Sequence, residues 1–367
     1  MIFVRGENLK VGMRLAKPIY NKKGVLLYER DSKLTNQGIE SVKNFGLIGL
    51  YILEPAEPVP PMTDEDVEFE RFQMVTSFAI QDELKELHDN GRIKVMPNLT
   101  ASIIKGYGRL DHKINFVQNL RSKEDELAKH SLNVAMLCAM MTHKLNVKLT
   151  DQNETVTAAL VHGVGELDIP DEIRSREEKT DNDKRVIYEC KKRGESIIEA
   201  AFLSTPTIKR IVSQSIKLLH SFEQGQPVDM KRTVTGAKVL STAIMFDNMT
   251  AMNDVTEPSS EISAVRFLME HEDVFEPDIV AALMDSINIL APGTSVELTN
   301  GDKGLVITEN KLNVLEPVIL SFSDNRIIDL GQSLIYGDLK IKDVMKTMDN
   351  RNIIDREALE KFGFGNS

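Results

Sequence analysis

Residues 159–170, which read ALVHGVGELDIP, place a histidine at the end of an apolar helix, just before a glycine turn and a proline. His162 stands where an imidazole could bind a metal ion, but its neighbour is Gly163, where a carboxylate would complete a pair of ligands. Adjacent His and Asp residues suit a two-metal hydrolase, because neighbouring helical side chains point about 100° apart and grip different sides of one site. The stretch is therefore either an active centre or the remnant of one.

Other segments carry residues of a similar kind in chain order. His130 lies in EDELAKHSLNVA, Cys190 in YECKKRGESII, His220 in IKLLHSFEQGQP and Ile244 in VLSTAIMFDNMTA. With residues 159–170, these segments resemble in order and spacing the HD-GYP domains, the cyclic di-GMP phosphodiesterase branch of the HD hydrolases. The stretches KVGMRLAKPIYNKKGVLLYERDSKLT and PGTSVELTNGDKGLVITENKLNVLEPVIL resemble sequences that often precede and follow such domains, so the resemblance extends over most of the chain.

The resemblance implies a set of metal-ligand positions, and several of them are changed here. These positions are His130, His162, Gly163, Cys190, His220 and Ile244. Gly163 replaces the bridging Asp of the family, Cys190 replaces a His, and Ile244 replaces the late Asp. The Lys that follows the glycine in the family is Glu166, which exchanges a cation for an acid, and the GYP signature is absent. No carboxylate ligand survives in this set.

The surviving residues cannot perform two-metal chemistry. Three neutral imidazoles do not neutralise two divalent cations, and without a bridging carboxylate a binuclear centre is not held together. Without a metal, no water is ionised near neutral pH to attack a phosphodiester. We therefore expect no intact metal centre, no catalytic residue and no cofactor, and the sequence assigns no ligand-binding residues.

One alternative stays open for the metal. A tetrahedral zinc site is compatible with the donor types of His130, His162, Cys190 and His220, provided that they converge. The interpretation that we favour is that these residues pack between helices, since His130 shares an apolar stripe with Val134 and Leu137.

Three functions follow from this reading, and the sequence leaves them open. The first is a non-catalytic HD-GYP-like regulatory or scaffold protein that acts through protein contacts and is linked to cyclic di-GMP signalling by analogy. The second is a sensor that binds a cyclic dinucleotide without cleaving it. The third is a metal-dependent cyclic di-GMP phosphodiesterase with a rebuilt site.

Composition limits the partners of the chain. Its 367 residues carry a formal net charge of −11, which disfavours nucleic acids and anionic membranes as partners. Cys138 and Cys190 both fall in helical patterns, so no disulfide framework is expected and a cytoplasmic location is predicted. No window of about 18 apolar residues is present, so no membrane span is expected. The sequence does not identify a partner protein, and a homodimer through residues 69–122 is left open.

The apolar periodicity predicts a mainly α protein, with a small α/β domain before the helices and a small β subdomain behind them. The resemblance implies that the helices form an HD-type bundle. The expected boundaries are 1–60 for the α/β domain, 61–122 for a linker and connecting helices, 123–290 for the HD-GYP-like bundle, 291–334 for the β subdomain and 335–367 for a helical tail. A hairpin is predicted around the turn at 21–24, and short helices are predicted from residue 338 onward.

Overall fold

The computed structural model describes residues 2–20, 25–44, 49–53, 64–116, 118, 121, 124–176, 178–201, 205–251, 258–310 and 313–345. The predicted turn at 21–24, residues 61–63 at the start of the predicted linker and the part of the predicted tail after residue 345 lie outside these ranges.

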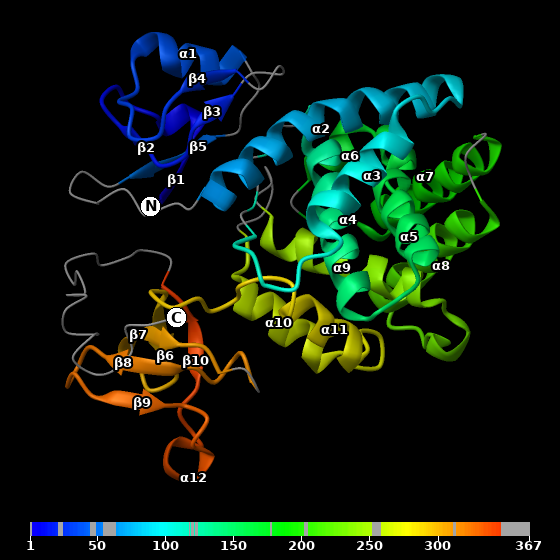
Figure 1. The fold of residues 1–367 in the computed structure, drawn as a ribbon. Coiled ribbons are helices and arrows are strands. Elements are labelled where there is room, and N and C mark those ends of the chain that lie inside the picture. The colour runs from blue at the N-terminus through cyan, green and yellow to red at the C-terminus, as the bar shows by residue number, and fades with distance from the viewer. Residues whose placement is uncertain are drawn as a thin grey trace.

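The described ranges form a helical body flanked by two small sheet-containing units (Figure 1). The long helices of the body are α2 (Asp64–Asn90), α3 (Met96–Tyr107), α4 (Glu126–Lys144), α5 (Leu149–Val161), α7 (Asp181–Ala200), α8 (Pro206–Glu223), α9 (Thr235–Thr250), α10 (Glu261–Glu270) and α11 (Pro277–Met284). The mainly α class predicted from the sequence is confirmed. No helix in the described part of the chain has the length and apolar character needed to span a membrane.

Helix α4 is the centre of the body, because its residues are buried on every side from Leu127 to Thr142. A helix that is buried all round needs neighbours all round. Helices α2, α3, α5, α9 and α11 supply them. The first turns of α4 and the end of α5 are thereby held side by side, which matters for the pocket described below.

The N-terminal unit has its own small core. Strands β1 (Ile2–Arg5), β5 (Gly49–Leu53) and β2 (Arg14–Leu15) form an antiparallel sheet in the order β1-β5-β2, and α1 (Asn36–Asn44) completes the unit. Strands β3 (Ile19–Tyr20) and β4 (Leu26–Tyr28) pair antiparallel, so the predicted hairpin is confirmed on both sides of its turn. The core consists of Leu9, Leu15, Ile19, Leu34, Val42, Leu50 and Ile52.

The C-terminal unit is a five-stranded sheet in the order β10-β6-β7-β8-β9. Its strands are β6 (Ser295–Leu298), β7 (Lys303–Thr308), β8 (Val318–Ser321), β9 (Ile327–Asp329) and β10 (Ile341–Val344). The helical prediction for the tail is wrong over β10, which pairs antiparallel with β6 and sets Ile341 opposite Leu298. Only four residues show the strand pattern, too few to reveal a strand whose partner lies some forty positions earlier. The short helix α12 (Ser333–Tyr336) precedes it.

Candidate functional site

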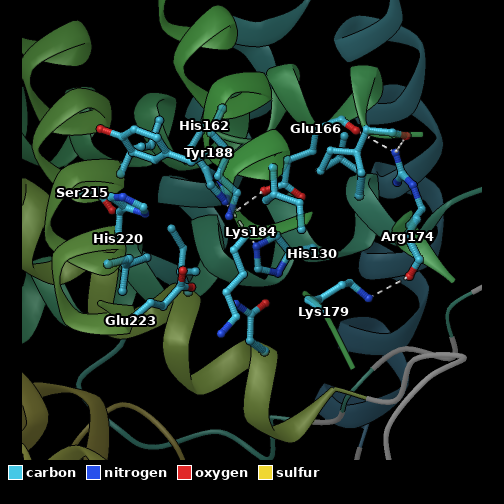
Figure 2. A pocket seen from close by; sticks show the side chains of 18 of the residues that line it. His130, His162, Glu166, Arg174, Lys179, Lys184, Tyr188, Ser215, His220 and Glu223 are labelled. Atoms are coloured by element: carbon cyan, nitrogen blue, oxygen red, sulfur yellow. Dashed lines mark hydrogen bonds and ion pairs between the residues drawn. The ribbon is translucent and has the colours of Figure 1, made fainter. Parts of the chain in front are cut away.

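A pocket of about 520 Å³ is lined by residues of α4, α7, α8 and α9 and of the 3-10 helix η2 (Val164–Asp168). The lining includes His130, His162, Glu166, Tyr188, Lys191, Ser215, His220 and Ile244. In Figure 2, Tyr188 and His220 lie on one side of the view and Arg174 on the other, with His130 and His162 between them. The structure therefore brings four of the sequence-predicted positions, His130, His162, His220 and Ile244, to one cavity.

His130 and His162 are in direct contact. Nε2 of His162 lies 3.2 Å from Nε2 of His130, and the ring centroids are 5.1 Å apart. His130 stands in the second turn of α4 and His162 caps the C-terminus of α5. Because these helices pack against each other in the body, the fold itself brings the two rings together.

The other nitrogen of each ring faces an oxygen that can only accept. Nδ1 of His130 lies 2.6 Å from Oδ2 of Asp247, and Nδ1 of His162 lies 2.6 Å from the carbonyl oxygen of Ala159. With Asp247 ionised, both Nδ1 atoms carry hydrogen. Two neutral rings would then set two Nε2 lone pairs against each other, so the contact requires one more proton on the pair or another cation between the rings. Burial, and after it the neighbouring His130 ring, lowers the pKa of His162 to about 4, so His162 resists taking up a proton.

Asp247 on α9 is the counter-ion of this pair. Its carboxylate is fully buried and accepts hydrogen bonds from Arg121 at 2.6 and 2.7 Å, and from Asn133 at 3.0 Å. Gln118 Nε2 donates a longer bond of 3.3 Å to the same group. Burial alone would raise the pKa of Asp247, but the Arg121 guanidinium and the His130 imidazole hold it well below its usual range.

A group of buried polar side chains around Asp247 was not predicted from the sequence. It comprises Gln118, Arg121, Asn133 and Asp247. The available signal was a carboxylate directly after the apolar run 243–246 of α9, since a buried acid needs a partner. The sequence did not identify Arg121 as that partner, because Arg121 lies outside any helix or strand and far from Asp247 in sequence.

Leu127 stands beside the position that lacks its carboxylate. A Cβ added at Gly163 would lie 2.5 Å from Cδ1 of Leu127, closer than non-bonded carbon atoms approach. Both residues are buried. Any side chain at position 163, a carboxylate included, therefore requires Leu127 to move away.

The negative charge of Glu166 is paired with a lysine on the neighbouring helix. Nζ of Lys191 on α7 lies 3.3 Å from Oε1 of Glu166, with 31% and 23% of the two side chains exposed. Burial alone would raise the pKa of Glu166, but Lys191, and after it the two histidines of the pocket, bring this pKa to about 2. Glu166 in turn raises the pKa of Lys191. The cation that the resemblance expects on η2 is thus replaced by one on α7, and both charges line the pocket.

The four candidate zinc ligands do not converge. His130 and His162 meet, but the thiol of Cys190 is buried and accepts a hydrogen bond from Nη2 of Arg193 at 3.0 Å. The His220 ring stacks on Tyr188 with centroids 3.8 Å apart. Over the described ranges, no three His, Cys, Asp or Glu side chains are arranged so that they could hold a metal ion.

The residues present do not fit the binuclear metal centre that the resemblance implies. Gly163 offers no bridging oxygen, Ile244 presents an apolar side chain to the pocket, and Cys190 is engaged elsewhere. Asp247, whose carboxylate is bonded to the His130 imidazole, already accepts hydrogen bonds from Arg121, Asn133 and Gln118. The site offers a ligand the cationic side chains of Lys191 and Arg121 beside two imidazole rings.

Comparison with known proteins agrees with the position of this pocket in the chain. The family model of the HD domain matches residues 127–266. A cyclic di-GMP phosphodiesterase of Pseudomonas aeruginosa is 20% identical over 240 residues, which are 58% of this chain and 54% of that protein. The chain spans about half the length of this curated relative. His130, His162 and Asp247 thus all lie inside the region that matches the HD domain model, whereas Arg121 and Glu126 of the pocket lining precede it. Residues 127–266 of this chain are therefore similar to the HD domain.

Proposed function

We propose that the chain is a non-catalytic HD-domain regulatory protein, which acts through protein contacts in cyclic di-GMP signalling. One observation carries the proposal: the position of the bridging carboxylate is Gly163, and Leu127 Cδ1 lies where a side chain would have to go. Without an oxygen that bridges two cations, a binuclear centre cannot ionise the attacking water. The apolar core around α4 does not depend on a metal, so the fold persists without one.

The test is metal content measured together with turnover. The full chain is purified without chelators, its metals are quantified, and cyclic di-GMP hydrolysis is followed with added manganese, iron or zinc. Substoichiometric metal and no product are expected. One or two equivalents of tightly held metal with metal-dependent product would contradict the proposal and establish the phosphodiesterase with a rebuilt site.

A gain-of-function variant sharpens this test. It combines Gly163→Asp, Cys190→His, Leu219→His and Ile244→Asp with Leu127→Ala, which makes room beside position 163. The resemblance implies a pair of histidines at positions 219 and 220, of which only His220 is present here. The matched control carries the same changes but keeps Leu127. If the pocket is a remnant, the variant with Leu127→Ala binds more metal than the control, because its carboxylate can reach the site.

A second candidate function, a cyclic dinucleotide sensor, is supported by the charge of the pocket wall. Arg174, Lys179 and Lys184 line the pocket, and within the described ranges none of them forms an ion pair with a carboxylate. Among the residues that the structure describes, Arg174 and Lys179 donate to backbone carbonyl oxygens, such as Glu166 O at 2.6 Å from Arg174 Nη2. Free cations in a cavity of this size suit an anionic small molecule in a chain whose net charge is −11.

Calorimetry with cyclic di-GMP tests the sensor. Binding that weakens about tenfold in Lys184→Met would support it, since one charge-assisted contact is worth about that much. Lys217→Met is the matched control, because Lys217 is an exposed lysine of α8 outside the pocket lining. No heat at saturating nucleotide would remove the sensor and leave the regulatory proposal standing.

A further inference from the structure

Lys17 ties the N-terminal unit to the helical body. Its Nζ donates a hydrogen bond of 3.2 Å to the backbone carbonyl oxygen of Gln118 and lies 3.8 Å from Oε1 of Glu70 on α2. It also lies 4.8 Å from the centre of the Tyr51 ring, which belongs to β5 of its own unit. Burial lowers the pKa of Lys17 to about 8, so this ammonium depends on these few partners for the solvation that it has lost.

Gln118 passes the connection on to the pocket. While its backbone oxygen accepts from Lys17, its side-chain Nε2 donates to Oδ1 of Asp247 at 3.3 Å and to Oγ1 of Thr250 at 2.8 Å. Its Oε1 accepts from Asn133 at 2.8 Å and from Arg121 at 3.3 Å. The same residue therefore holds the N-terminal unit through its main chain and the Asp247 cluster through its side chain.

Asp247 in turn sets the orientation of His130, through the bond of 2.6 Å between Oδ2 and Nδ1. Gln118 lies outside the helices and strands, between α3 and α4, so no regular hydrogen-bond ladder fixes its place. Tertiary bonds such as the one from Lys17 must fix it instead. A displacement of Lys17 would shift Gln118, whose side-chain Nε2 donates a hydrogen bond to the carboxylate of Asp247.

We propose that the N-terminal unit controls the pocket, with Lys17 and Gln118 as positioning residues that act on His130 through Asp247. A partner or signal that moves the N-terminal unit changes the hydrogen bonding of Asp247, and so changes the imidazole that faces the ligand space. In this proposal Gln118 is the element that changes state: its carbonyl oxygen is bonded to Lys17 in the structure, and it is released when the N-terminal unit moves away. It requires neither bound metal nor catalysis, so it stands or falls separately from the proposed function.

The test reads the imidazoles directly by nitrogen NMR of ¹⁵N-histidine-labelled full-length protein, with signals assigned through His130→Gln and His162→Gln. Lys17→Met is expected to shift or broaden the His130 signals and to speed amide exchange in α9 about tenfold, the effect of one lost hydrogen bond on local opening. Lys33→Met, at an exposed lysine of the same unit, is the matched control and leaves both readouts unchanged. Lys17→Arg, which keeps a cationic donor, restores the wild-type signals.

A double-mutant cycle separates coupling from simple loosening. In a Gln118→Leu background, whose His130 signals are themselves shifted, Lys17→Met should add no further change. Full, additive effects of both substitutions on His130 would overturn the proposal, as would wild-type His130 signals in a folded Lys17→Met protein. Should Lys17→Met unfold the N-terminal unit, Glu70→Gln weakens the same junction without removing the ammonium, and wild-type His130 signals in that variant likewise count against the coupling.

Discussion

At Gly163 the backbone has an ordinary conformation, with φ of −88° and ψ of 3°, so a side chain there would clash with the Leu127 side chain and would cause no backbone strain. Gly163→Ala should therefore lower the free energy of unfolding by about 1–3 kcal/mol, the usual effect of overpacking a core. In a Leu127→Ala background, Gly163→Ala should cost much less, because the clash with Leu127 is gone. Urea unfolding of the two single variants and the double variant would measure this difference.

Gly106→Ala is the matched control, because a Cβ at Gly106 on α3 would meet no atom within 4 Å. There the substitution should be neutral or stabilising, since alanine restricts the unfolded chain. If Gly163→Ala lowered the free energy of unfolding equally in the wild-type and the Leu127→Ala backgrounds, the clash at position 163 would not be with Leu127.

His162 makes the stability of the protein depend on pH. Folding lowers its pKa from 6.5 to about 4, so between these values the unfolded chain binds the proton more tightly than the native protein does. The contribution is complete above about pH 6.5 and is lost as the pH falls toward 4, by about 3 kcal/mol in total. Unfolding by urea at intervals of pH from 7 to 4.5 measures this slope.

His162→Gln should flatten the slope in this window, because glutamine does not titrate. His112→Gln should keep it, since His112 is an exposed histidine whose side chain is 59% accessible. An unchanged slope in His162→Gln would place the acid sensitivity elsewhere in the molecule.

At the scale of elements, η2 and α7 approach each other through two glycines. A Cβ added at Gly165 would lie 2.2 Å from the backbone oxygen of Cys190, and one added at Gly194 would lie 2.7 Å from the backbone nitrogen of Gly165. This close approach brings Glu166 within reach of Lys191. Backbone atoms cannot rotate away as the Leu127 side chain can.

Gly194→Ala should therefore be more damaging than Gly163→Ala, with a loss of about 3 kcal/mol or more in the free energy of unfolding. The substitution should also separate η2 from α7 and weaken the ion pair of Glu166 with Lys191. Urea unfolding, with Gly106→Ala again as the exposed helical control, measures the difference. A loss below that of Gly163→Ala would mean that the two elements can slide apart at little cost.

The elements were easier to predict from the sequence than the contacts between them. Apolar periodicity is a property of one segment: it predicts a helix over residues 124–145, and α4 spans Glu126–Lys144. The meeting of His130 with His162 came from the family resemblance. The bonds from Gln118 and Arg121 to Asp247, and from Lys191 to Glu166, join segments that carry no common pattern, so only the folded chain reveals them.

At the scale of the whole molecule, the C-terminal sheet is held to the helical body at its edge. Arg266 on α10 donates from Nη1 to the carbonyl oxygen of Lys342 at 2.7 Å and from Nη2 to that of Ile341. Both acceptors belong to β10, which pairs with β6 and, over the described ranges, with no second strand. An edge strand of four residues has few other bonds to keep it in place.

Arg266→Met should release β10 without unfolding the helices. Two charge-assisted hydrogen bonds are worth about 3 kcal/mol together, which corresponds to amide exchange in β10 more than a hundredfold faster. Hydrogen exchange of a peptide covering β10 measures this, with β7 in the middle of the sheet as the internal reference. Arg326→Met is the matched control, because Arg326 is 80% exposed and pairs with Asp324 inside the sheet unit. Equal exchange of β10 in both variants would mean that β6 alone anchors the strand, and that the sheet can move as a unit relative to the pocket.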